Sequence, residues 1–153
     1  MRAVYVPTGS RAPVGVDLAD AQDFFCLAEI VQTSAQGAPS PAIVLADGSA
    51  SSLMCANTVD GVVVVMSIDN EHSYHGINPN WNPGAGAVTC SFDFLGTETA
   101  ISPRNTVPMQ VAQQVVTAYF EGGFPRALRV APWEPDWSGA EPTAADVDVV
   151  PVG

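Results

Sequence analysis

One short polar stretch near the middle of the chain has the character of a metal site. It contains Asp69, Glu71, His72 and His75. Histidine and carboxylate side chains are the ligands that zinc takes in catalytic sites. However, Gly76 and the Asn78-Pro79 step argue against the helix that would bring both histidines to one face. We therefore expect loop histidines with no metal ion and no cofactor, and keep a small metal-dependent enzyme as an alternative.

No other pattern in the chain predicts catalysis. The sequence contains no G-x-S-x-G elbow, no P-loop and no G-x-G-x-x-G fingerprint. The carboxylates are numerous, but no pair is distinguished by its spacing. The cysteines Cys26, Cys55 and Cys90 are widely spaced among apolar neighbours, which is typical of buried, reduced thiols. We expect a protein that is not an enzyme.

Residues 70–87, which read NEHSYHGINPNWNPGAGA, are predicted to form a long loop. Two Asn-Pro steps and several glycines interrupt any regular pattern. The simplest interpretation is a surface connection between two strands. Long ordered loops usually serve a purpose, so a recognition loop that presents Tyr74, His75 and Trp81 is the alternative that we favour.

The elements around this loop predict an α+β fold. Apolar alternation and turn signals indicate strands over residues 2–6, 42–46, 52–56, 62–68, 88–94, 98–101 and 127–130. One amphipathic helix is predicted over 17–33 with Asp17 as its N-cap, and a second from Pro108 to Gly122. We expect an antiparallel sheet of about five to seven strands with two main helices packed on it. Residues 1–135 would form a single domain, and residues 136–153 an acidic, proline-containing tail.

Charge restricts the partners of this protein. The chain of 153 residues has no lysine, five arginines and sixteen carboxylates, for a formal net charge of −11. Such a surface repels nucleic acid and anionic membranes and attracts basic proteins, although solubility alone would also account for it. No signal peptide is visible, and the apolar run at 62–66 is too short to span a bilayer. We expect a cytoplasmic protein.

Residues 101–133 resemble the C-terminal half of the first-numbered family of bacterial immunity proteins, which is common in actinobacteria. The resemblance rests on a Val107-Pro108 helix entry, an apolar helix that ends in Tyr119-Phe120-Glu121-Gly122-Gly123, and Pro125 before a short strand that closes on Trp133. A strand over 62–68 and a long loop before Val88 are similar as well. The chain departs from the family at Ala131-Pro132, which loosens the final strand, and in its tail.

The resemblance implies an immunity protein that binds a polymorphic toxin, often a zinc-dependent nucleic-acid deaminase, and occludes its active site. No catalytic residue carries over, because the family has none. An acidic inhibitor suits a toxin whose substrate groove is basic. The expected partner contacts are Asp69, Glu71, Tyr74, Trp81, Asp93 and Glu98. The alternatives are the metal-dependent enzyme built on His72 and His75, and an acidic mimic of nucleic acid that blocks another DNA-binding protein.

Overall fold

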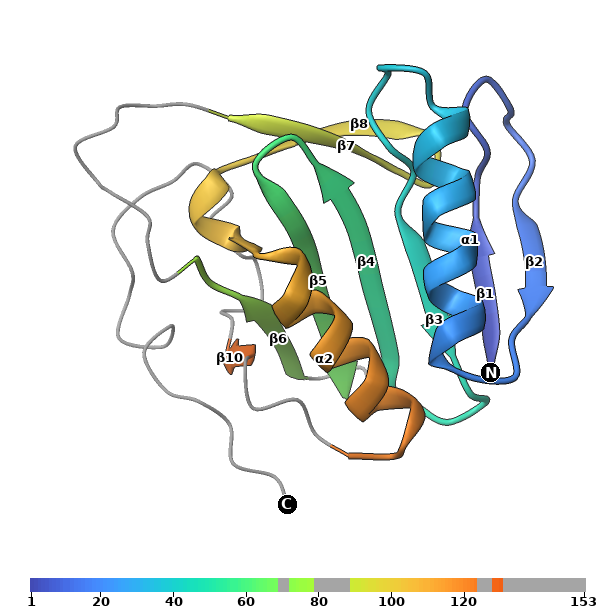
Figure 1. The fold of residues 1–153 in the computed structure, drawn as a ribbon, viewed down its shortest axis with the longest axis vertical. Helices are drawn as coiled ribbons and strands as arrows, with labels where there is room; N and C mark the ends of the chain where they lie inside the picture. The colour runs from blue at the N-terminus through green and yellow to red at the C-terminus, as the bar shows by residue number, and fades with distance from the viewer. Residues whose placement is uncertain (69–71, 79–88, 124–127, 131–153) are drawn as a thin grey trace.

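The computed structural model describes residues 1–68, 72–78, 89–123 and 128–130, and Figure 1 shows one large sheet with two helices lying against it. The strands of this sheet are β1 (Arg2–Tyr5), β2 (Val14–Asp17), β3 (Ile43–Ala46), β4 (Ser52–Thr58), β5 (Gly61–Ile68), β6 (His72–Gly76), β9 (Thr106–Val107) and β10 (Leu128–Val130). The helices are α1 (Ala21–Ser34) and α2 (Met109–Phe120).

Every strand pair of the large sheet is antiparallel. The strand order is β10-β6-β5-β4-β3-β1-β2, and β9 pairs with β5 beside β6. The predicted α+β fold, with two helices on an antiparallel sheet, is confirmed. The predicted tail over 136–153, and Trp133 before it, lie outside the described residues. Among the helices that are described, none is both long and apolar enough to cross a membrane.

β5 is buried on both faces, which explains its uninterrupted run of valines. Successive strand residues point to opposite faces of a sheet. Val62, Val64 and Met66 belong to a core shared with α1 and α2. Val63 belongs to a second core on the other face. A strand covered on both sides reads as a continuous apolar run instead of an alternating one.

A separate hairpin covers that second core. It consists of β7 (Cys90–Phe94) and β8 (Thr97–Ile101), which pair only with each other as strands of a two-stranded sheet. Cys90, Phe92 and Ile101 pack against Ala42 and Val63 of the large sheet. The backbone also holds the hairpin in place, because the Asp93 N–H donates to the Ser40 carbonyl and the Ala42 N–H donates to the Asp93 carbonyl.

α1 begins later than its sequence pattern predicts. The prediction of Asp17 as N-cap is wrong, because Asp17 ends the unpredicted edge strand β2. Asp20 is the N-cap, and its carboxylate accepts from the Asp23 N–H at 3.0 Å. In return Asp23 accepts from the Ala19 N–H at 2.8 Å, so the two carboxylates satisfy two backbone donors at the start of the helix.

The segment predicted as one long loop contains a strand. β6 pairs with β5 through Tyr74 opposite Met66 and His75 opposite Val65. The polar sequence of β6 hides this strand, because pairing and burial come from its neighbour. Gly76 is the last residue of β6, where the strand paired with β5 changes from β6 to β9. A side chain at this position would collide with Val107.

Candidate functional site

The structure brings two of the predicted contact residues together and places a third elsewhere. Asp93 and Glu98 are direct partners across the β7–β8 hairpin. Tyr74 is half-buried against the core beneath the helices, on the opposite face of the sheet. The other three predictions, Asp69, Glu71 and Trp81, lie outside the described residues. The hairpin is therefore the part of the predicted site for which the structure gives side-chain positions.

The outer face of the hairpin carries an unfavourable pair of charges. Asp93 is half-buried and Glu98 is exposed, and like charges directly opposite each other destabilise a strand pair. Asp93 is held in place because its Oδ1 accepts from the Gly96 N–H at 2.8 Å. This bond gives Asp93 a role in the turn and leaves Glu98 as the carboxylate that faces solvent.

The tip of the hairpin exposes two apolar side chains in a strained turn. Phe94 is 43% exposed and Leu95 is 44% exposed. The two turn residues have positive φ, 49° at Leu95 and 99° at Gly96, as a two-residue type I′ turn requires. Leucine is disfavoured at positive φ, and strain of this kind gathers at functional sites. Sequence reasoning missed Leu95, although a Leu-Gly pair where Asn-Gly is usual was the available signal.

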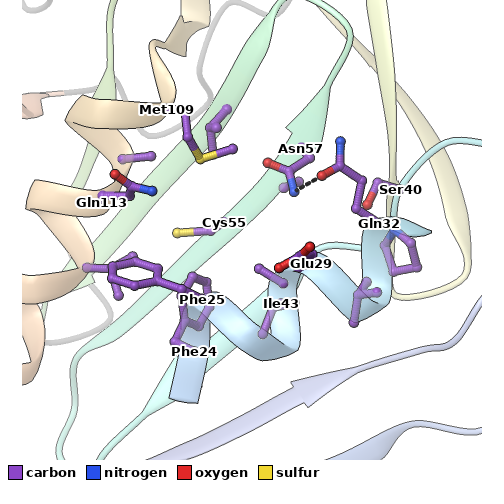
Figure 2. Close-up of a pocket in the computed structure, with 17 residues that line it drawn as sticks. Phe24, Phe25, Glu29, Gln32, Ser40, Ile43, Cys55, Asn57, Met109 and Gln113 are labelled. Atoms are coloured by element: carbon purple, nitrogen blue, oxygen red, sulfur yellow. Dashed lines mark hydrogen bonds between the residues drawn. The ribbon is translucent and has the colours of Figure 1, made fainter. Parts of the chain in front are cut away.

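A second candidate site is a groove between α1 and α2, which Figure 2 shows from the helix side. Its volume is about 270 Å³. The floor comes from β3, β4 and β5, with Ile43, Cys55 and Val62 all buried. Phe24 and Phe25 of α1 form one wall, and α2 forms the other. The sequence did not predict this groove, because its lining comes from five separate elements, α1, β3, β4, β5 and α2.

Polar side chains gather at the rim of the groove. Gln32 and Asn57 are joined there by a hydrogen bond of 3.3 Å from Asn57 Nδ2 to Gln32 Oε1 (Figure 2). Gln113 and Glu29 also line the groove and are exposed. None of the side chains that line the groove is cationic. The rim thus offers amide groups and one carboxylate above an apolar floor.

The chemistry of the groove suits binding better than catalysis. Cys55 is the reactive group at its floor, but burial raises the pKa of this thiol to about 12. The thiol, unlike the thiolate, is a poor nucleophile, so Cys55 stays inert at neutral pH. The prediction of buried thiols is confirmed for Cys55 and Cys90 and wrong for Cys26, which is exposed on α1.

His75, one of the two histidines of the proposed metal site, is buried within the sheet as part of β6. His75 is only 2% exposed, and its Nδ1 donates to the Gly76 carbonyl at 3.2 Å. Within the described ranges, no three His, Cys, Asp or Glu residues are grouped as metal ligands would be. The burial of His75 and its bond to the backbone do not favour a metal ion at this residue.

The described surface carries mainly negative charge. Eight carboxylates are exposed: Asp17, Asp20, Asp23, Glu29, Asp47, Asp60, Glu98 and Glu121. Over residues 1–68 and 89–123 the exposed arginines are Arg2 and Arg11, and Arg2 is already paired with Asp17 at 3.0 Å. Arg104 does not offset this charge at the surface, because it is 1% exposed. The excess negative charge therefore faces solvent.

Comparison with family models, curated proteins and solved structures finds no match for this chain. The resemblance of residues 101–133 to the immunity family thus remains a prediction from the sequence, and the functional interpretation depends on the hairpin, the groove and the charge.

Proposed function

We propose that this protein is a cytoplasmic immunity protein, which binds a cognate toxin and occludes its active site. The observation that carries the proposal is the exposed charge over residues 1–68 and 89–123. Eight carboxylates are exposed there against two arginines, one of which is already paired. A toxin that acts on DNA or RNA needs a basic groove to hold phosphates. An acidic surface is steered to such a groove and competes with its substrate.

The β7–β8 hairpin is the contact element that we assign to this binding. Its tip exposes Phe94 and Leu95, and Glu98 is an exposed carboxylate on the outer face of the same hairpin. Apolar anchors with a polar rim are the usual composition of a protein contact. A cationic partner would also relieve the repulsion between Glu98 and Asp93, so the charges that weaken the free hairpin would stabilise the complex.

The proposal is tested by co-expressing the chain with the toxin domain encoded beside its gene. We expect cell survival and a stoichiometric complex that co-purifies. Replacing Leu95 with glycine and Glu98 with lysine should abolish both, because the apolar anchor is removed and the charge is reversed. Glu121→Lys is the matched control, since Glu121 follows α2 at the end of the molecule away from the hairpin (Figure 1).

Each outcome decides one part of the proposal. Cell death in the presence of the unaltered chain would rule out the immunity function. Survival with the double variant would remove the hairpin from the interface. Equal loss with Glu121→Lys would mean that total charge, and no particular surface, controls binding. The acidic nucleic-acid mimic, our second candidate, is favoured if the chain binds unrelated DNA-binding proteins as tightly as the toxin.

A further inference from the structure

We infer that the groove between α1 and α2 is an anchor site for one arginine side chain of a basic protein partner. This inference rests on the proposed function and names the chemistry by which the partner is held. It starts from the contrast between the apolar floor of the groove and its rim, where Glu29 is the charged group. A ligand that matches both must have an aliphatic stem and a cationic head, as arginine does.

The size of the groove suits a side chain better than a cofactor. Its volume of about 270 Å³ lies just below the roughly 300–1,000 Å³ that is typical of small-molecule sites. It is also much larger than the roughly 30 Å³ that one water takes up. A single long side chain lies between these limits.

The polar rim favours a guanidinium over an ammonium group. Gln32 Oε1 accepts one bond from Asn57 at 3.3 Å, and a carbonyl oxygen has a second lone pair to offer. Gln113 adds another amide oxygen on the α2 side. A guanidinium has five N–H donors in one plane and can reach several acceptors together with Glu29, whereas an ammonium is a compact charge with three donors.

The groove also adjoins the hairpin. Ser40 and Pro41 line the groove, the Ser40 carbonyl accepts from the Asp93 N–H at 2.9 Å, and Pro41 bridges to Asp93. The hairpin and the groove lie on opposite faces of the sheet and meet at this Ser40–Pro41 segment, so one partner contacts both by reaching round it. Arginine is among the residues that dominate binding energy in protein interfaces.

The inference is tested with n-butylguanidinium, titrated into the full chain and followed by NMR of the Met109 methyl group, which lies at the rim. n-Butylammonium and 1-pentanol serve as the lysine-like and neutral probes. We expect saturable binding that is tightest for the guanidinium. Glu29→Gln should weaken both cations about two- to fivefold, as one exposed ion pair would, and leave pentanol unchanged.

Two variants serve as controls. Glu121→Gln removes the same charge outside the groove and should leave the affinity for all three probes unchanged. Ala28→Leu fills the groove from α1, where Ala28 is half-buried, and should abolish binding of all three probes while thermal unfolding confirms that the fold persists. Binding of pentanol as tight as that of guanidinium, with no effect of Glu29→Gln, would overturn the inference, as would the absence of saturable shifts.

The toxin complex separates this inference from the proposed function. If the toxin domain binds the unaltered chain and Glu29→Gln and Ala28→Leu leave its affinity unchanged, the groove is not the anchor site and the immunity function stands. If butylguanidinium binds as expected but no toxin complex forms, the proposed function fails and the groove keeps its preference for a guanidinium.

Discussion

Leu95 combines two properties that rarely meet in one residue. It is half-exposed and apolar, and its backbone takes a φ of 49°. A left-handed conformation costs an L-residue about 1 kcal/mol or more. Asparagine would fit the same type I′ turn with less strain. A leucine at this position therefore lowers the stability of the turn and leaves an apolar side chain exposed, as the proposed anchor role requires.

We expect Leu95→Asn to raise the free energy of unfolding by about 1 kcal/mol and to weaken the toxin complex. Urea unfolding and a binding titration measure the two effects. Gln36→Asn is the matched control, because Gln36 is exposed and has a φ of 50°. This control should stabilise the fold similarly and leave binding intact. A Leu95→Asn variant that binds as tightly as the unaltered chain would contradict the anchor role.

The raised pKa of the buried Cys55 thiol predicts that the protein loses stability at alkaline pH. Burial raises the pKa of its thiol from 9.0 to about 12, so above pH 9 the unfolded chain releases a proton that the folded chain retains. The free energy of unfolding then falls by about 1.4 kcal/mol per pH unit between pH 9 and 12. Unfolding midpoints from pH 8 to 11 test this. Cys55→Ala should flatten the slope, and an unchanged slope would exclude Cys55 as its source.

At the scale of an element, α1 shows how the stability of a helix depends on its N-cap. Asp20 and Asp23 together accept from two backbone N–H groups that the helix itself cannot satisfy. Asp17, three residues earlier, forms a salt bridge with Arg2 in which its side chain is 85% exposed. Exposed pairs of this kind contribute little. Asp17 and Asp20 look alike in the sequence, but Asp20 stabilises the start of the helix and Asp17 forms only an exposed ion pair.

We expect Asp20→Ala to lower the free energy of unfolding by about 1 kcal/mol, as the loss of an N-cap does. Asp17→Ala should lower it by less than about 0.5 kcal/mol, because only an exposed ion pair is lost. Both values come from denaturant unfolding of the full chain at neutral pH. If both variants lost the same free energy of unfolding, or if Asp17→Ala lost more, the result would contradict Asp20 as the N-cap and favour the helix start at Asp17.

At the scale of the whole molecule, the net charge of −11 would control the rate of encounter with the proposed basic partner. Carboxylates spread over the described surface act together at long range, and salt screens them over about 8 Å at physiological ionic strength. We expect the association rate with the toxin domain to fall about tenfold or more between low and high salt, with little change in the dissociation rate. Stopped-flow mixing measures both. An association rate indifferent to salt would exclude electrostatic steering.

The parts of this molecule that local pattern determines were predictable, and those that depend on distant segments were not. β5 and β7 follow from their apolar residues, and α2 from its Pro108 entry. β6 escaped prediction because its polar sequence becomes a strand only by pairing with β5. Asp93 and Glu98 could be grouped from the sequence because one hairpin joins them. The groove could not be predicted from the sequence, because Phe25, Cys55 and Gln113 come together only after folding.

The position of β5 has a consequence for how the protein opens. Its backbone is hydrogen-bonded to β4 along one edge and to β6 and β9 along the other, and packed side chains shield it from both sides. Solvent can reach its amides only when the whole molecule comes apart. In heavy water, the β5 amides should exchange their protons at the rate of global unfolding, while those of the edge strand β2 exchange much sooner.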